Sequence, residues 1–318
     1  MENTSKEIKK QSCIMPGKNK FKKAMRNWEL YLLLIVPVTF VLVFSYYPML
    51  GLQIAFKNYN PSDGIWGSPF VGLYQFKRVL SSPKFFQVFR NTLTLSLYQL
   101  IISPPLTVAF SLALNAVRSK VYKKTVQMLT YMPHFISTVI MVGILVQLFN
   151  PRVGLYGNIC GLLGIEAKDL WSSANAFPHF YVWSSIWQSL GWSSIIYLAA
   201  LASVDTELYD AAEIDGASRF KQLIYIDFPS ILPTVVILII MRVGQIMSVG
   251  YEKVLLMQNS LNLSTSEIIS TYSYKVGLQT GTDYSYGTAI GLLNSVINLI
   301  LLVIVNKISK KVTETSLW

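Results

Sequence analysis

Six long apolar blocks alternate with shorter polar segments along the chain. Each block has roughly the 20–25 residues that an α-helix needs to cross the hydrocarbon core of a bilayer. A large soluble core could bury one such helix, but six of them with few charges between them indicate an all-α integral membrane protein. The expected spans are about 30–50, 92–116, 127–149, 180–203, 231–250 and 285–306.

The composition supports this interpretation. Hydrophobic residues make up 52% of the 318 residues, whereas soluble domains have roughly 45–50% apolar content even with glycine counted. The net charge is +11, but the basic residues gather at the ends of the apolar blocks and not on a helix with interleaved aromatics, so no nucleic-acid partner is expected. The first block follows a basic tail and precedes no small-residue cleavage site, which predicts an uncleaved first span.

The distribution of lysine and arginine predicts the orientation. If the N-terminus lies in the cytoplasm, the inner segments hold seventeen of the 27 basic residues and the outer segments hold nine, with one inside a span. Basic residues favour the cytoplasmic side of a membrane protein, so both termini are expected there. The predicted organisation is a cytoplasmic tail over 1–28, a six-helix transmembrane domain over 29–310 and a cytoplasmic tail over 311–318.

The segment 204–230, between the fourth and fifth spans, has the most distinctive local pattern. It predicts a helix over 206–214 with Asp205 as its N-cap and Gly216 at its end, because glycine accepts the left-handed backbone that often follows a helix. A second short helix over 218–226 is expected to end at Pro229. The first helix is acidic, whereas a helix lying on the membrane surface would have a wide apolar face with a basic rim.

This segment resembles the EAA loop of binding-protein-dependent ABC importer permeases. The family pattern is Glu-Ala-Ala, three residues, Gly, nine residues and Ile-x-Leu-Pro, and this chain keeps that spacing with Asp and Phe in place of Glu and Leu. In the family this loop docks in a groove of the ATPase subunit. The resemblance therefore implies an ATPase-coupling loop whose main residues are Asp210, Ala211, Ala212, Gly216, Ile226 and Pro229.

The resemblance also implies the partners. The chain has no Gly-x-x-x-x-Gly-Lys-Ser/Thr phosphate-binding pattern, so no enzyme activity and no cofactor are expected of it, and ATP would bind to separate subunits. A second homologous permease, two ABC ATPase subunits and an extracytoplasmic solute-binding protein would complete the assembly in the bacterial cytoplasmic membrane, in contact with lipid. No metal site is expected, because Cys13 and Cys160 lack ligand spacing.

Three further stretches resemble the MalF- and LplB-like carbohydrate permeases. They are 48–61 with 70–73, 242–244 with 250–257, and 294–298, and they imply an oligosaccharide or a polysaccharide fragment as the cargo. An ABC permease for a non-sugar solute remains an alternative. A secondary transporter would need ionisable groups at the membrane midplane and often has inverted repeats, and a membrane-embedded enzyme would need a cluster of carboxylates, histidines or metal ligands.

Polar side chains fall on single faces of the last three spans. Such stripes should face protein or water and not lipid, and aromatic rings beside hydroxyls and amides suit sugars. Asparagines could instead link helices, and Arg242 could be a structural or gating partner within the permease pair. The candidate translocation path comprises Tyr181, Ser184, Gln188 and Trp192 in the fourth span, Arg242, Gln245 and Ser248 in the fifth, and Asn294 and Asn298 in the sixth.

Overall fold

The computed structural model describes residues 28–279 and 283–313, and these residues form helices without a named strand. An isolated bridge pairs Lys57 with Phe70. The chain divides into two compact units, 1–53 and 54–318. The helical class predicted from the apolar blocks is therefore confirmed for the described residues.

The first unit contains the first apolar block. Helix α2 (Trp28–Val41) continues through a π-helical turn (Leu42–Tyr46) into α3 (Tyr47–Met49), and a 3-10 turn follows over Leu50–Phe56. The widened turn precedes Pro48, which has no N–H for the helical hydrogen-bond ladder. The whole segment Trp28–Phe56 is 29 residues long and apolar enough to cross a membrane.

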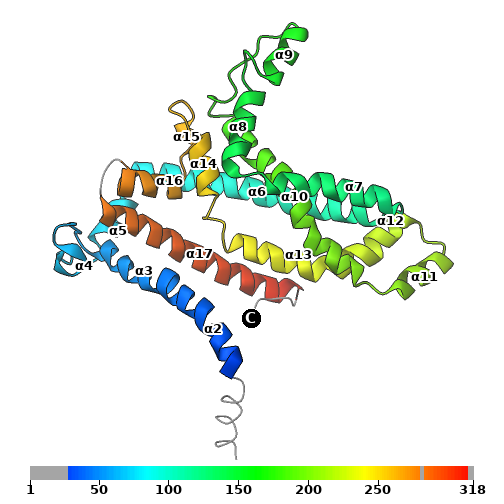
Figure 1. Ribbon diagram of the computed structural model, residues 1–318, viewed down its shortest axis with the longest axis horizontal. Helices are drawn as coiled ribbons and strands as arrows, with labels where there is room; N and C mark the ends of the chain where they lie inside the picture. The colour runs from blue at the N-terminus through cyan, green and yellow to red at the C-terminus, as the bar shows by residue number, and fades with distance from the viewer. Residues whose placement is uncertain (1–27, 280–282, 314–318) are drawn as a thin grey trace, which may run out of the picture. The chain divides into compact units, whose positions relative to one another are not determined.

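Four long helices form the centre of the second unit. They are α6 (Pro83–Asn115), α10 (Phe177–Ala202), α13 (Phe228–Val243) and α17 (Tyr284–Thr313). Helix α10 packs along α6, and α13 contacts α6, α10 and α17 (Figure 1). Thr107 and Ser111, inside α6, donate their hydroxyls to carbonyls one turn earlier, at 2.7 and 2.8 Å. These bonds satisfy polar groups that the helix buries.

The third expected span is divided between two helices. Helix α7 (Lys120–Tyr131) and a 3-10 turn (Met132–Phe135) precede α8 (Thr138–Leu148), and the two parts are bent by 101°. Pro133 interrupts the hydrogen-bond ladder, and the Ser137 hydroxyl caps α8 by accepting from the Ile140 amide at 3.4 Å. Continuous apolar character over 127–149 therefore does not give a single straight helix.

Four described helices are long and apolar enough to cross a membrane, or five if the bent pair counts as one span. The single helices are Trp28–Phe56, Pro83–Asn115, Arg219–Val243 and Tyr284–Lys311. Helix α10 occupies the fourth expected span but is not one of these four helices, and its sequence is rich in serine, tryptophan and tyrosine. Several apolar helices support a multi-pass membrane protein.

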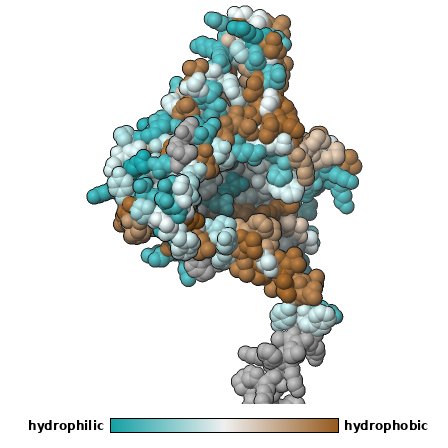
Figure 2. Space-filling model, turned by 60° about the vertical axis from the view of Figure 1, so that its left-hand side comes forward, coloured by the Kyte–Doolittle hydropathy of each residue, from teal (hydrophilic) through white to brown (hydrophobic). Residues whose placement is uncertain are grey.

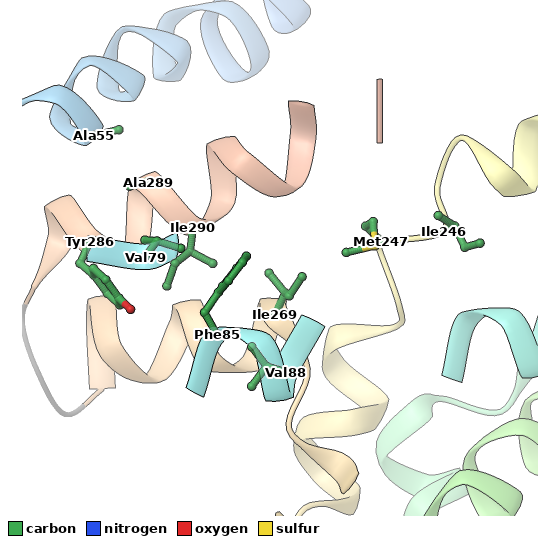
Figure 3. Packing of buried hydrophobic residues seen from close by; sticks show 10 residues of the cluster. All are labelled: Ala55, Val79, Phe85, Val88, Ile246, Met247, Ile269, Tyr286, Ala289 and Ile290. Carbon is green, nitrogen blue, oxygen red and sulfur yellow. The ribbon is translucent and has the colours of Figure 1, made fainter. Parts of the chain in front are cut away.

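Buried apolar side chains gather in clusters between these helices. Figure 3 shows one of them, which joins α5 (Tyr74–Leu80), α6, α16 (Ile269–Tyr274) and α17 through residues that include Val79, Phe85, Ile269 and Ile290. Other large apolar side chains are exposed, and Figure 2 shows such residues in brown on one face. On α17 they include Leu299, Ile300 and Ile308, which suits helices that face lipid.

The polar connections lie at the two ends of α6. Figure 1 places α11 (Thr206–Ile214) at one end, and α14 (Tyr251–Met257), α15 (Leu263–Ser266) and α16 at the other. At the latter end, Lys84 pairs with Glu267 at 2.5 Å, and the Thr92 hydroxyl accepts from the Ile269 amide at 3.0 Å. The segments 204–230 and 251–279 are therefore separated by most of the length of this helix.

Candidate coupling surface and polar cavity

Helix α11 begins and ends where the sequence predicts. The Asp205 carboxylate accepts a hydrogen bond from the Glu207 amide at 3.0 Å and caps the first turn. After the helix, Gly216 has φ +70°, and the Ala217 amide donates to the Ala212 carbonyl at 2.8 Å. Only glycine adopts this left-handed conformation without a steric cost, so Gly216 turns the chain sharply.

The surface of α11 has apolar side chains that no neighbour covers. Asp210 and Ala211 are exposed and Ala212 is half-buried. Large apolar residues nearby are also exposed, with 51% of Leu208 and 87% of Ile214 accessible. An exposed apolar patch beside polar groups is typical of a protein-interaction site, and small alanine side chains let another backbone come close.

A buried hydrogen bond joins α11 to the base of α13. The Tyr209 hydroxyl donates to Asp227 Oδ1, and Asp227 is only 4% exposed. Burial raises the pKa of Tyr209 above its usual value, and the adjacent Asp227 carboxylate adds to this shift. The Asn115 side chain, at the end of α6, also hydrogen-bonds with Tyr209. This network could not be predicted from the sequence, because a tyrosine and an aspartate 18 positions apart form no recognisable motif.

The second short helix of the segment does not end at Pro229, so this prediction is wrong. Helix α12 (Arg219–Gln222) passes through a π-helical turn (Leu223–Asp227) directly into α13, and the helix runs unbroken over Arg219–Val243. Pro229 lies in the first turn of α13, and the Ser230 hydroxyl donates to the Ile226 carbonyl at 2.6 Å. The widened turn accommodates the proline, so both Ile226 and Pro229 lie within one helix.

A polar cavity of about 390 Å³ lies among α6, α10 and the chain after α13. The fifth expected span, 231–250, crosses this region, but α13 ends at Val243 and non-helical chain follows to Gly250. A Cβ at Gly244 would lie 2.6 Å from Leu302 Cδ1, so a close approach to α17 accompanies the end of the helix. The lining side chains are Ser96, Gln99, Leu100, Tyr181, Ser189, Ser193, Arg242, Gln245, Ile246, Ser248 and Val249.

The cavity brings together four of the nine predicted path residues: Tyr181, Arg242, Gln245 and Ser248. Arg242 Nη1 donates to the Ser103 hydroxyl at 3.1 Å. No carboxylate among the described residues lies within ion-pair distance of this guanidinium. A cation in a membrane-spanning helix is costly and normally has a functional role, so Arg242 is the most unusual group of the lining.

Three residues predicted on the fourth span lie outside this cavity. Gln188 Nε2 donates to the Ile136 carbonyl at 2.8 Å and so ties α10 to the break between α7 and α8. The Trp192 ring stacks on the His134 ring with centroids 4.6 Å apart. Ser184 lines a separate, apolar cavity of about 410 Å³, and its hydroxyl donates to carbonyls of its own helix.

The two asparagines of α17 differ from each other. Asn298 Oδ1 accepts from the Met247 amide at 2.9 Å, and its Nδ2 donates to the Ser248 hydroxyl at 3.0 Å. These bonds hold the non-helical chain that lines the cavity, which matches the interhelical alternative for Asn298. Asn294 Oδ1 is buried without a hydrogen-bond partner among the described residues.

A buried lysine beside the cavity was not predicted. Lys253 is 7% exposed, its Nζ donates to the Ser185 hydroxyl at 2.8 Å, and it lies 5.6 Å from the centre of the Tyr181 ring. Burial lowers the pKa of Lys253 to about 7. Nothing in the sequence pattern singled out Lys253, although its position directly before the apolar run 254–257 was a signal of burial.

Metal-ligating groups do not cluster in the part of the chain that the structure describes, where no set of three histidines, cysteines or carboxylates converges. Cys160 is buried and free. Cys13 lies outside the described residues, as does most of the predicted tail over 1–28.

Comparisons with known proteins agree on one family. The model of the family described as "Binding-protein-dependent transport system inner membrane component" matches residues 105–314. Protein LplB of Bacillus subtilis (strain 168) is 42% identical over 293 residues, which cover 92% of each chain. The polygalacturonan/rhamnogalacturonan transport system permease protein YteP of the same organism is 38% identical over 296 residues, covering 93% of this chain and 92% of its own.

A solved structure has the same fold. A chain in the crystal structure of a bacterial alginate ABC transporter, in complex with an alginate pentasaccharide-bound periplasmic protein, superposes with a TM-score of 0.85. It is 36% identical, and the match covers 93% of this chain and 99% of the other.

Proposed function

The chain belongs to the family of binding-protein-dependent transport system inner membrane components, and from this premise we propose that it is the permease subunit of an ATP-driven ABC importer for an oligosaccharide or polysaccharide fragment. The observation that carries the proposal is the likeness, over nearly the whole chain, to a polygalacturonan/rhamnogalacturonan permease and to a chain of an alginate transporter. The cavity supports it, because amide, hydroxyl and aromatic groups line the space beside α6 and α10.

The proposed topology has six spans with both termini in the cytoplasm. The segment Trp28–Phe56, α6, the bent pair α7–α8, α10, α13 and α17 would be the six. The excess of basic residues in the inner segments supports this orientation. It puts α11 on the cytoplasmic side and α14–α16 on the outer side.

In the proposed assembly, α11 docks on an ATPase subunit and a second permease completes the pathway. The exposed apolar side chains of α11 support such a contact. An extracytoplasmic solute-binding protein would deliver the cargo near α14–α16. ATP binding would close the ATPase dimer, and the docked loop would transmit that motion so that the helices change from inward-facing to outward-facing. The two states must be nearly equal in free energy for ligands to shift their populations.

Reconstitution tests this function. The chain is co-expressed with its partner permease, ATPases and solute-binding protein and placed in liposomes, and uptake of labelled oligosaccharides is measured with ATP inside or outside. We expect uptake only with ATP on the ATPase side. Uptake that persists without the ATPase subunits and follows an ion gradient would contradict the proposal and favour a secondary transporter. ATP-driven uptake of amino acids or phosphate, without saccharides, would contradict the cargo.

A further inference from the structure

We propose that the polar cavity selects acidic saccharides, with the Arg242 guanidinium pairing with the carboxylate of a uronic-acid residue as the cargo passes. This inference rests on the proposed carbohydrate importer and adds the chemical class of its cargo.

A single charged side chain lines the cavity. Arg242 is the only charged residue among those that line it, and the other polar lining groups are hydroxyls and amides. In the low dielectric of a membrane interior, one uncompensated cation dominates the local potential. The cavity therefore attracts an anion and offers no carboxylate that would repel one.

The geometry of Arg242 suits a carboxylate ligand. A guanidinium has five N–H donors, and Arg242 uses one of them in the hydrogen bond from Nη1 to the Ser103 hydroxyl. That bond fixes one side of the group, and further donors remain for a ligand. The planar fork of arginine matches a carboxylate with two parallel hydrogen bonds, which a lysine does not offer.

A second basic side chain, Lys253, lies behind the cavity wall. Lys253 contacts Ser185 and the ring of Tyr181, and Tyr181 lines the cavity. No carboxylate in the described ranges pairs with Lys253. A buried cation without a counter-ion is unfavourable, so an anion in the cavity would offset part of the cost of protonating Lys253 and would pair with the half-buried Arg242.

The acids at the same end of the second unit do not compensate these cations. Glu267 pairs with Lys84 and Lys275, and Asp283 pairs with Arg78. Glu252 is exposed. The hydroxyls and amides that line the cavity can bond the neutral hydroxyls of a sugar, and the volume falls in the range of small-ligand sites, roughly 300–1,000 Å³.

The test compares matched saccharides in the full reconstituted transporter. The probes are labelled trisaccharides of galacturonate and of mannuronate, each beside its carboxyl-reduced neutral counterpart. We expect the wild-type complex to take up at least one uronate trisaccharide faster than its neutral counterpart. We expect Arg242→Gln to lower uronate uptake by about tenfold or more, because a charge-assisted bidentate pair is lost, and to leave neutral uptake within about twofold.

Two further variants separate recognition from folding. Arg242→Lys keeps the charge without the fork and should fall between the wild type and Arg242→Gln. Arg152→Gln removes an arginine exposed in an outer loop and should transport both saccharides as the wild type does. The thermal unfolding temperature of each purified complex shows whether it is folded.

Three results would overturn the inference. Equal loss of uronate and neutral uptake in Arg242→Gln would make this residue structural. Preferential uptake of the neutral trisaccharides by the wild type would show that the cavity does not select acidic saccharides, and the proposed importer function would still hold. If the wild type takes up no saccharide but takes up another solute, both the inference and the proposed function fail.

Discussion

At the scale of single residues, the buried Tyr209–Asp227 hydrogen bond is the contact through which the proposed coupling loop would act on α13. It connects the exposed helix α11 to the first turns of the helix that ends at the cavity. Asp227 is almost fully buried, and a buried carboxylate that loses a donor keeps its desolvation penalty. The geometry of α11 relative to α13 should therefore depend on one hydroxyl.

The variant Tyr209→Phe tests this dependence. We expect it to destabilise the protein by about 1–3 kcal/mol and to reduce the stimulation of ATPase activity by the loaded solute-binding protein, while basal ATPase activity persists. The control is Tyr225→Phe, because Tyr225 lies on the same segment and is 75% exposed. Wild-type stimulation in Tyr209→Phe would show that this bond has no part in coupling.

Lys253 gives a prediction about pH. Its pKa is about 7 in the folded protein and about 10.4 in an unfolded chain. Between these values the unfolded chain binds a proton that the folded protein does not bind, so the free energy of unfolding rises as the pH is raised from 7 towards 10. Below pH 7 Lys253 is protonated in both the folded and the unfolded state, so its contribution to the free energy of unfolding stays at its lowest value.

The variant Lys253→Met removes this contribution. Thermal unfolding in detergent should show the variant more stable than the wild type at pH 7, by a few kcal/mol at most, with the difference shrinking towards pH 10. The structure places the titratable side chain of Tyr181 against the Lys253 ammonium. Helices α8 and α16 also pack against α14. Helix α8 has no titratable residue, and Tyr274 of α16 lies against Tyr251. A difference that does not change with pH would mean that Lys253 titrates normally.

At the scale of elements, the turn after α11 depends on the positive φ of Gly216. Gly216→Ala should cost about 1–2 kcal/mol, because an L residue is strained there. Gly216→Pro is incompatible with this φ and should leave the protein inserted but unable to couple ATP hydrolysis to uptake. Gly143→Ala is the control, since that position lies within α8 and a Cβ there meets no atom within 4 Å. Normal uptake by Gly216→Pro would count against docking through this turn.

The elements also show what the sequence could predict. Long apolar blocks and the Asp205 cap are local signals, so the helical class and the bounds of α11 followed from them. The bend between α7 and α8 has local signals in Pro133 and the Ser137 cap. The position of this bend against α10 and the early end of α13 depend on other helices, through the Gln188–Ile136 bond and the approach of Gly244 to Leu302. Hydrophobic patterning does not encode these contacts.

The candidate path illustrates the same limit. Helical periodicity put the polar residues of α10 on one face, but it did not reveal which neighbour covers each turn. Gln188 and Trp192 contact Ile136 and His134 at the break between α7 and α8, so neither lines the polar cavity. Trp192 instead lines a neighbouring cavity together with Arg242 and Gln245. Tyr181 and Arg242 remain on the polar cavity because the non-helical chain after α13 leaves that side open.

At the scale of the whole molecule, the proposed topology makes the two ends of α6 chemically distinguishable. In a chain whose natural cysteines are replaced by serine, a cysteine at Ala211 should react with an impermeant thiol reagent only from the cytoplasmic side. A cysteine at Ser264, which is exposed at the other end, should react only from outside. Labelling of both from the same side would contradict the six-span arrangement.

The proposed assembly gives a second test with the same two variants. A short bifunctional crosslinker should join a cysteine at Ala211 to an ATPase subunit in the intact complex and should not join a cysteine at Ser264 to it. The yield should change when ATP is bound, because the ATPase dimer then closes. If Ala211 reaches no ATPase, the coupling role of α11 fails.

The unbroken helix from Arg219 to Val243 has one last consequence. Its 25 residues make a rod about 37 Å long, with one end beside the segment that follows α11 and the other at Arg242. A tilt of about 10° at the near end would swing the far end by about 6 Å, twice the length of a hydrogen bond. In the proposed assembly, a movement of the ATPase subunits would therefore reach the Arg242 guanidinium through the tilt of one helix. No series of side-chain rearrangements between the two sites would be needed.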